Sequence, residues 1–303
     1  MRGHFSTRIL ICIVFLAIPV CSQTPRGDAS HRIRLGLLDD AREEMVNWKP
    51  GVAQQRIVRP AFEKTATGWK KVNASSLPAH MTWTVAFDGK NLGTLETQAR
   101  SEDGLTPLQA PLTPQSALPL VGSSSEQFAG LLADGGQTKV RRPLIVVSQP
   151  YFHNPDGWRR TKLPDEIGAL VRTAFRREYP HVDRCKDEEI VKRNWKFPDS
   201  ALSFPSVYGS KKHSFLVEAD LDAGDCGYIS EPDDPESVPW FFVAPDGSVR
   251  RIGSFMTLLD AGDYDNDGRS EVVFFLSQGE NTDGFVLFDS TFKKPVTLAW
   301  HYH

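Results

Sequence analysis

Four carboxylate side chains lie within nine consecutive residues near the C-terminal end of the chain. Asp263, Asp265, Asp267 and Glu271 belong to the segment DYDNDGRSE. The aspartates alternate, so a tight loop can turn all three toward one centre, where they would repel one another without a cation. Gly268 permits the left-handed backbone conformation that carries such a loop around an ion. The pattern therefore predicts a metal site.

The spacing also indicates which metal and which further ligands to expect. The carbonyl oxygen of Arg269 and the carboxylate of Glu271 can complete the shell, and a shell of six to eight oxygens with some geometric freedom favours calcium over magnesium. An EF-hand would need a closing acid at Phe274 and two flanking helices, whereas the segment from Glu271 to Leu276 is typical of a β-strand. An aspartate-rich turn that binds no metal is the alternative.

The segment AGDYDNDGRSEVVFF, residues 261–275, resembles the calcium loop of FG-GAP (VCBS-type) repeats. These repeats build the β-propellers of integrin alpha subunits and occur in many exported bacterial proteins. The resemblance implies a fold of propeller-like antiparallel β-repeats in the C-terminal region. It also implies a set of calcium ligands, namely Asp263, Asp265, Asp267, the Arg269 carbonyl and Glu271. The chain departs from the family in two respects, because the family usually has aspartate at the position of Glu271 and its full propellers are longer than this chain.

The elements that flank this loop occur twice. The first copy has strand patterns at 215–222, 240–244 and 249–255, and the second has them at 256–263, 284–288 and 295–300. A spacing in the range of ~20–50 residues indicates stacked or radially arranged units, propeller blades among them. In the first copy Asp220 and Asp222 are followed by Gly224 and Asp225, which replace the third carboxylate and the glycine. We therefore expect this copy to bind calcium weakly or not at all.

The rest of the chain is predicted to be mainly β, with one amphipathic helix at about 164–179. Residues 23–100 form an N-terminal β-rich region with a hairpin turn at Asp88-Gly89. Residues 101–127 contain several prolines and few aromatics, which is typical of a linker or a long surface loop. Residues 128–303 form the C-terminal β-repeat region. Its helix has apolar residues at helical spacing, namely Ile167, Leu170, Val171, Ala174 and Phe175.

The N-terminus has the pattern of a secretory signal peptide. Arg2 and Arg8 give a positively charged region before the apolar run Ile9–Val20, which is shorter than the ~20 residues needed to span a bilayer. We expect cleavage near Ser22, which gives a signal peptide of residues 1–22 and a protein that is secreted or located in the periplasm or cell envelope. In the alternative, Cys21 carries the lipid of a lipoprotein. No other stretch is apolar enough to cross a membrane, so no transmembrane segment is expected in the mature chain.

Two cysteines, Cys185 and Cys226, remain once Cys12 and Cys21 leave with the leader. In an oxidising compartment an isolated pair is most simply a disulfide. It would close a loop of about 40 residues and contribute ~3–4 kcal/mol in the chain-entropy model. Two unpaired buried thiols are the alternative.

Composition and motifs narrow the possible functions. The formal net charge of −3 and the lack of a basic run argue against a nucleic-acid partner. The sequence offers no catalytic constellation, so the first hypothesis is a non-enzymatic, calcium-stabilised β-repeat protein. It would be a binding or envelope-associated scaffold module with a protein or carbohydrate ligand. The alternative is a secreted hydrolase of polysaccharide or peptide whose active site the motifs do not reveal.

Overall fold

The computed structural model describes most of the chain that follows the predicted signal peptide. The described residues are 32–40, 56–99, 107–114, 117–119, 143–150, 153–224, 237–277 and 282–301. The predicted signal peptide, Asp225 and Cys226 lie outside them.

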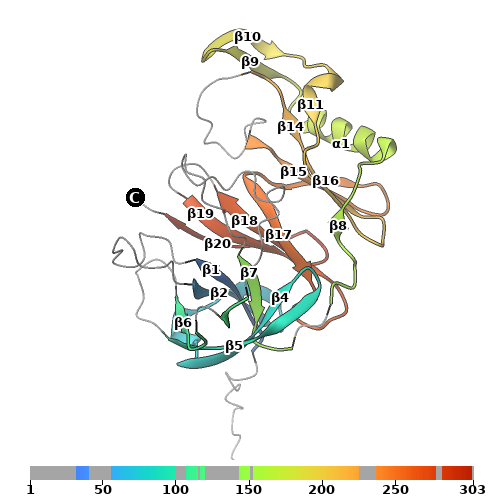
Figure 1. The fold of residues 1–303 in the computed structure, drawn as a ribbon. Coiled ribbons are helices and arrows are strands. Elements are labelled where there is room, and N and C mark those ends of the chain that lie inside the picture. Colours follow the sequence, from blue (N-terminus) through green and yellow to red (C-terminus); the bar gives the residue numbers. More distant parts are fainter. Residues whose placement is uncertain are drawn as a thin grey trace, which may run out of the picture. The chain divides into compact units, whose positions relative to one another are not determined.

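The N-terminal strands form a barrel-like antiparallel sheet (Figure 1). The strands follow one another in the order β1-β7-β4-β5-β6-β2-β3, and an additional pairing of β1 with β2 closes the first six into a ring. Their bounds are Arg34–Asp40 (β1), Arg56–Thr65 (β2), Gly68–Lys71 (β3), His80–Phe87 (β4), Lys90–Ala99 (β5), Gln109–Pro111 (β6) and Leu144–Val147 (β7). Closure removes the unpaired backbone groups that the edges of an open sheet would present.

Successive residues of the barrel strands belong to two different apolar clusters. In β7, Leu144 and Val146 pack in one cluster with Trp83, while Ile145 and Val147 pack in another that also contains residues of the C-terminal half. Since side chains alternate between the faces of a strand, the first cluster fills the barrel and the second covers its outer surface.

The segment predicted as a linker, residues 101–127, contributes a strand to the barrel. Within its described part, β6 pairs with both β2 and β5. The buried side chain of Gln109 accepts hydrogen bonds from the Trp83 indole nitrogen (2.9 Å) and the Thr97 hydroxyl (2.6 Å). The proline-rich composition of the segment 101–127 did not predict a strand, because the contacts that order β6 come from residues distant in sequence.

The described residues of the C-terminal half form two larger sheets and two small strand pairs (Figure 1). The first large sheet has the order β16-β15-β13-β12-β8, with bounds Arg159–Arg160 (β8), Val207–Gly209 (β12), Phe215–Glu218 (β13), Trp240–Val243 (β15) and Val249–Gly253 (β16). The second is the meander β17-β18-β19-β20, with bounds Met256–Gly262, Glu271–Ser277, Thr282–Phe288 and Val296–His301. The pairs are β9 with β10, Val182–Lys186 and Glu189–Trp195, and β11 with β14, Leu202–Ser203 and Asp220–Leu221.

The meander β17–β20 is buried on both faces. In β18, Val273 and Phe275 pack in the cluster shared with the outer surface of the barrel, whereas Val272 and Phe274 pack with Trp240 of the five-stranded sheet. The residues from Arg32 onward thus form one unit with shared cores, across the boundary predicted at 101–127. The almost continuous apolar run of β18 is what a strand covered on both sides requires.

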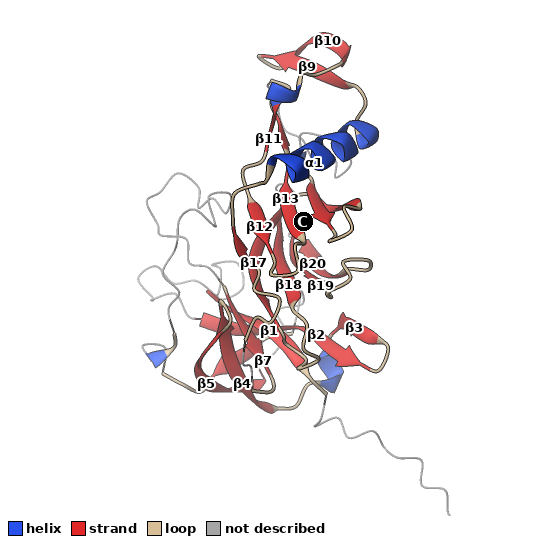
Figure 2. Ribbon diagram, turned by 90° about the vertical axis from the view of Figure 1, so that its right-hand side faces the viewer, coloured by secondary structure: helices blue, strands red, loops and turns tan. Residues whose placement is uncertain are grey.

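The predicted helix is present as α1, Asp165–Glu178 (Figure 2). It contacts β15 and β16 (Figure 1). Val171, Ala174 and Phe175 are buried against Phe241 and Val243. Acidic residues occupy its first turn and arginines its last, in accord with the helix dipole. Leu170, which the periodicity places on the apolar face, is instead 37 % exposed at its border.

The prediction of a mainly β protein with one amphipathic helix is confirmed for the described residues, but their strands do not form a clear propeller. The two sequence copies also differ in structure. In the first, β15 pairs directly with β13, whereas in the second β18 lies between β17 and β19. None of the helices in the described part of the chain has the length and apolarity needed to cross a bilayer.

We predict that Phe274→Ala destabilises the protein by about 3–5 kcal/mol, because it leaves a cavity between two sheets. The Phe274 ring is fully buried, with its centroid 5.1 Å from that of Trp240 and 5.8 Å from that of Phe288. Denaturant unfolding measures the change. Val191→Ala is the control, because Val191 is 56 % exposed and its truncation should cost less than about 0.5 kcal/mol. Similar losses for both variants would contradict the two-sided burial of β18.

Candidate metal centre

The acidic loop connects β17 to β18. The two strands are antiparallel, and Gly262 pairs with Glu271, so the residues between them form the hairpin connection. The loop enters a β-strand directly, as the sequence predicts, and it is not flanked by the two helices of an EF-hand. Asn266 and Gly268 have φ angles of 59° and 82°, so the predicted left-handed glycine is present where the chain turns.

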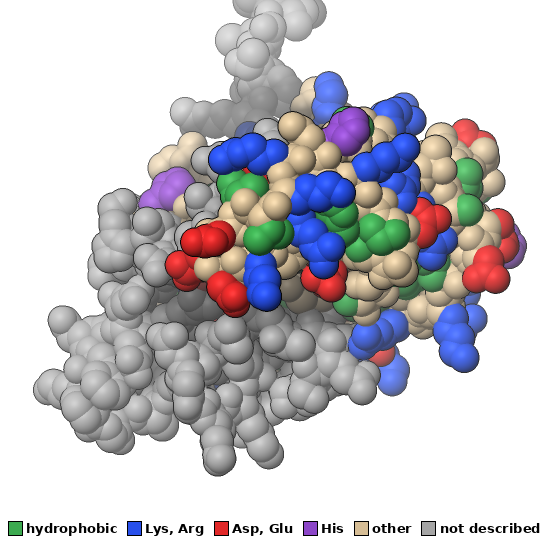
Figure 3. Space-filling view, turned by 90° about the horizontal axis from the view of Figure 1, so that it is seen from above, with side chains coloured by type: hydrophobic (Ala, Val, Ile, Leu, Met, Phe, Trp, Pro, Cys, Tyr) green, Lys and Arg blue, Asp and Glu red, His purple; other side chains and the backbone are tan. Residues whose placement is uncertain are grey.

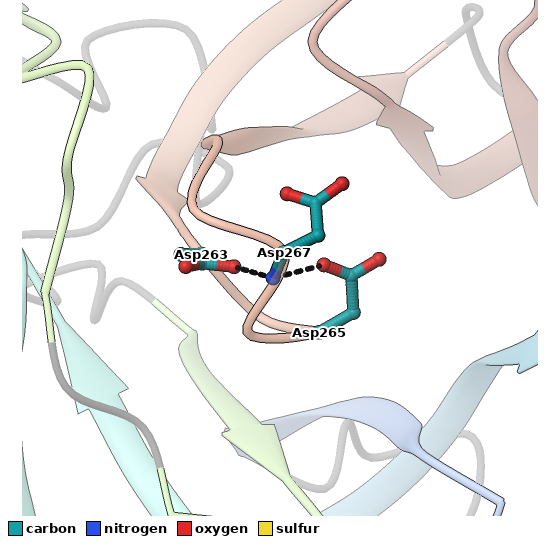
Figure 4. Close-up of side chains that lie close together, drawn as sticks. All are labelled: Asp263, Asp265 and Asp267. Atoms are coloured by element: carbon teal, nitrogen blue, oxygen red, sulfur yellow. Dashed lines mark hydrogen bonds between the residues drawn. The ribbon is translucent and has the colours of Figure 1, made fainter.

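The three aspartates converge. One carboxylate oxygen from each of Asp263, Asp265 and Asp267 lies within 4.8 Å of the other two. Figure 4 shows Asp263 and Asp265 on either side of the backbone nitrogen of Asp267, which donates to both, at 2.9 and 3.2 Å. The second oxygen of Asp263 accepts from the Gly268 nitrogen at 2.9 Å. These three carboxylates, which offer hard oxygen donors, could hold a metal ion.

The electrostatics of the loop favour a cation. Burial raises the pKa of Asp263, and the neighbouring Asp265 and Asp267 raise it further. Glu271 is 1 % exposed, and its burial, followed by the charge of Asp265, raises its pKa to about 8. Asp263 and Glu271 are therefore held in surroundings that disfavour their charged forms, and a divalent cation would reverse that preference.

Glu271 and Arg269, the other two predicted ligands, are not part of the group of three converging carboxylates. The Glu271 carboxylate accepts a hydrogen bond from the Tyr264 nitrogen at 2.9 Å, and it does not belong to the group of three oxygens within 4.8 Å. Arg269 is exposed, and its backbone nitrogen donates to the Asp267 carboxylate at 2.9 Å. Their assignment as metal ligands stays a prediction.

Lys64 of β2 is a member of the site that the sequence did not indicate. Its ammonium group forms an ion pair with Asp265. Burial by itself would lower the pKa of Lys64, but the hydrogen bond to Asp265 and the charges of Asp265, Glu271 and Asp267 outweigh burial and raise it. Because Lys64 lies far from the loop in sequence, only the folded chain brings this cation to the carboxylates.

The segment between β7 and β8 holds the far end of the loop. The Ser270 nitrogen donates to the buried carboxylate of Asp156 at 2.9 Å. The Ser270 hydroxyl donates to the Asn154 side-chain oxygen at 2.8 Å. Hydrogen bonds to a buried charged group are among the stronger ones, so this contact fixes the residue just before β18.

The near end of the loop is anchored through Tyr264. Its buried ring belongs to the cluster shared with the barrel, and its hydroxyl donates to Asp260 at 3.1 Å. The other oxygen of Asp260 accepts from the backbone nitrogen of Asp88, in the β4–β5 turn, at 2.9 Å. The Gln149 side chain donates to the Tyr264 carbonyl at 2.9 Å. The loop is therefore tied to the barrel and to its own sheet before any metal binds.

The upstream copy is different. Among the described residues, Asp220 and Asp222 are not part of a group of three converging ligands. Burial, and then the charge of Asp222, raises the pKa of Asp220. Asp225 lies outside the described residues, so the expectation of weak or absent binding at this copy stays a prediction.

Cys185 lies in β9 and is buried. Its backbone nitrogen donates to the Ala223 carbonyl at 2.9 Å. Gly224 packs so closely on it that a Cβ atom there would lie 1.9 Å from the Cys185 carbonyl oxygen. This brings the chain close to Cys185 two residues before Cys226, but Cys226 itself is not described, and the disulfide stays a prediction.

The surface around α1 and the β9–β10 hairpin carries many charged side chains (Figure 3). Exposed basic residues alternate there with exposed acids, and the basic ones are Arg177, Arg184, Lys186, Lys192, Arg193 and Lys196. The mixture of both signs is typical of a solvated face.

Comparison of the chain with family models, curated proteins and solved structures found no match in any of the three. The resemblance to FG-GAP repeats therefore depends on the loop motif and its flanking strands.

We predict that Lys64→Met strengthens binding of a divalent cation by roughly fivefold, or on the order of 1 kcal/mol, because a competing positive charge leaves Asp265 while the apolar stem is kept. Isothermal titration calorimetry with calcium measures the affinity. Lys70→Met is the matched control, since Lys70 on β3 pairs with Glu63 at 2.9 Å instead. Unchanged or weaker binding by the Lys64 variant would show that its ammonium does not compete for the site.

Proposed function

We propose that this protein is an exported, calcium-binding protein of the FG-GAP type, in which calcium has a structural role. The observation that carries the proposal is the convergence of Asp263, Asp265 and Asp267 at the entrance of β18. A site of several carboxylate and carbonyl oxygens suits calcium, which accepts six to eight oxygen ligands in varied geometry, better than magnesium, which demands near-ideal octahedral geometry. In this proposal the Arg269 carbonyl and Glu271 complete the shell.

A structural role accords with the surroundings of the loop. Ser270 is held by Asp156 and Asn154, and Tyr264 is held in the core, so the loop joins distant elements of the fold. Bound calcium would neutralise carboxylates whose charged forms the fold disfavours. When the calcium concentration is ten times the dissociation constant, calcium binding raises the free energy of unfolding by on the order of 1–2 kcal/mol.

Export supplies the conditions for such a site. Calcium sites of extracellular modules are typically weak, with dissociation constants of about 10⁻⁴–10⁻³ M, and they are filled only where ambient calcium is high. The signal-peptide pattern of residues 1–22 and the pair Cys185 and Cys226 both suit that compartment. We propose that the protein is a binding or envelope-associated scaffold module there.

The test is a calcium titration followed by thermal melting. We expect calcium to raise the melting temperature of the wild type by about 2–4 °C for each kcal/mol of stabilisation, and to leave Asp265→Ala unchanged. Glu189→Ala, which removes an exposed acid of β10, should respond as the wild type does. Equal responses of the wild type and Asp265→Ala would remove the site assignment, and an equal response to magnesium would remove the choice of calcium.

The disulfide is tested on the mature protein recovered without reductant. We expect peptide mass spectrometry to find Cys185 and Cys226 in one cross-linked peptide that reduction separates. Reduction should lower the free energy of unfolding by ~3–4 kcal/mol, since it releases the closed loop. Two freely alkylated thiols in the unreduced protein would refute the pairing.

A further inference from the structure

A pocket of about 740 Å³ lies where turns of the two C-terminal sheets meet. Its walls come from residues 156–158, the β12–β13 turn, the β15–β16 hairpin and the β19–β20 turn, and Arg269 of the metal loop completes them. This volume falls within the range of about 300–1,000 Å³ that is usual for small-molecule sites. The pocket is separate from the carboxylate group, because none of the three aspartates lines it.

The lining has an excess of positive charge in a protein whose net charge is negative. Four basic side chains line the pocket, namely Lys212, Arg250, Arg269 and Lys293, against the two acids Asp156 and Asp246. Asp156 and Lys212 form an ion pair at 2.6 Å, so their charges cancel. Arg250, Arg269 and Lys293 then outnumber the one remaining acid, Asp246, which accepts from the Ser248 nitrogen at 2.9 Å. The pocket therefore attracts a negatively charged group.

Arg250 is positioned to receive that group. Its guanidinium donates to the Thr291 carbonyl at 2.8 Å, which joins the two hairpin turns, and lies 5.5 Å from the centre of the Phe242 ring. A guanidinium held in place at the pocket wall can donate hydrogen bonds to the oxygens of a carboxylate or a sulfate.

The remainder of the lining suits a polyol ring. Trp158, Phe242 and Phe292 form an apolar wall, with Phe242 and Phe292 stacked at 4.4 Å between ring centres. Hydroxyl-bearing residues surround this wall, namely Ser210, Ser214, Ser248, Ser290 and Thr291. Apolar surface bordered by hydroxyl groups matches a sugar ring, whose faces are apolar and whose edge carries hydroxyls.

We propose that this pocket binds an acidic saccharide, a sugar that carries a carboxylate or a sulfate group. The acidic group lies near Arg250 and Lys293, and the ring lies toward the aromatic wall. The proposal deepens the binding role proposed above by naming the class of ligand, and it rests on that role but not on calcium.

The test is isothermal titration calorimetry of the full mature chain in the presence of a chelator. The probes are a galacturonic acid disaccharide, a sulfated disaccharide, a neutral disaccharide and inorganic sulfate. We expect at least one acidic disaccharide to bind about tenfold or more tightly than the neutral one and than sulfate alone. The two acidic probes distinguish a carboxylate from a sulfate ligand. Equal binding of neutral and acidic sugars, sulfate binding as tightly as the sugars, or no binding at millimolar concentration would overturn the proposal.

Variants locate the binding. Arg250→Gln and Lys293→Gln should each weaken the acidic disaccharide about tenfold, and Lys293→Gln is included because its exposed side chain can be changed without loss of the fold. Lys196→Gln, on the α1 and β9–β10 face, is the matched control and should bind as the wild type does. Unchanged binding by both pocket variants, with normal melting curves, would place the sugar elsewhere and overturn the proposal.

The result can be separated from the calcium proposal. Asp265→Ala should keep its affinity for the acidic disaccharide, whether or not calcium raises the melting temperature of the wild type. Loss of sugar binding in this variant would contradict a pocket that acts without the metal.

Discussion

The strand β18 has no face toward solvent, and this constraint determines where the metal loop lies. Phe275 packs toward the outer surface of the barrel and Phe274 toward the five-stranded sheet. A shift of one residue in its pairing would exchange the side chains of the two cores and disrupt the packing of both, so the observed register is favoured. The end of the metal loop is therefore attached, at Glu271, to a strand whose position is fixed by its packing. Side chains next to a fixed strand can hold metal ligands in a more exact geometry than side chains of a mobile loop.

The burial of this region also disfavours the negative charges of the acidic loop. Asp263 and Glu271 lie in surroundings that raise their pKa values, and in both cases burial is the main cause. Lys64 relieves part of this by pairing with Asp265. A lysine brings one positive charge on a flexible stem and donates hydrogen bonds, whereas a divalent cation brings two charges and accepts several oxygens at once. The lysine can thus support the fold without a metal, yet it is a weaker match to the group than a metal ion would be.

The features that the sequence predicted are those encoded by neighbouring residues. The helix was expected at about 164–179 and is found at Asp165–Glu178, and the turn at Asp88-Gly89 is present with positive φ at both residues. The glycine of the acidic loop and the strand after it are also present. Each of these depends on periodicity, turn chemistry or strand propensity within a few residues.

The features that the sequence did not predict depend on distant partners. β6 is a strand because β2 and β5 offer it backbone hydrogen bonds and because Trp83 and Thr97 bind Gln109, which outweighs its proline-rich composition. Lys64 reaches Asp265 only after the barrel has packed on the meander. The two sequence copies match without β18, because the sequence of the first copy has no strand pattern that corresponds to it. In the structure β18 lies between β17 and β19, so the two copies have different strand orders. No local pattern carries this information.

Asp156 connects the metal loop with the pocket, in addition to Arg269, which belongs to the loop and also lines the pocket. One oxygen of Asp156 accepts from the Ser270 nitrogen at the end of the loop, and the other pairs with Lys212 in the pocket. An anion that binds near Lys212 would weaken the ion pair between Lys212 and Asp156. Asp156 also accepts the hydrogen bond from the Ser270 nitrogen, so the end of the metal loop would be affected. Linkage requires that any effect of the pocket ligand on metal affinity be returned in equal measure by the metal. Because Asp156 is buried and its contacts to Ser270 and Lys212 are 2.9 and 2.6 Å long, a change at one of these contacts alters the other.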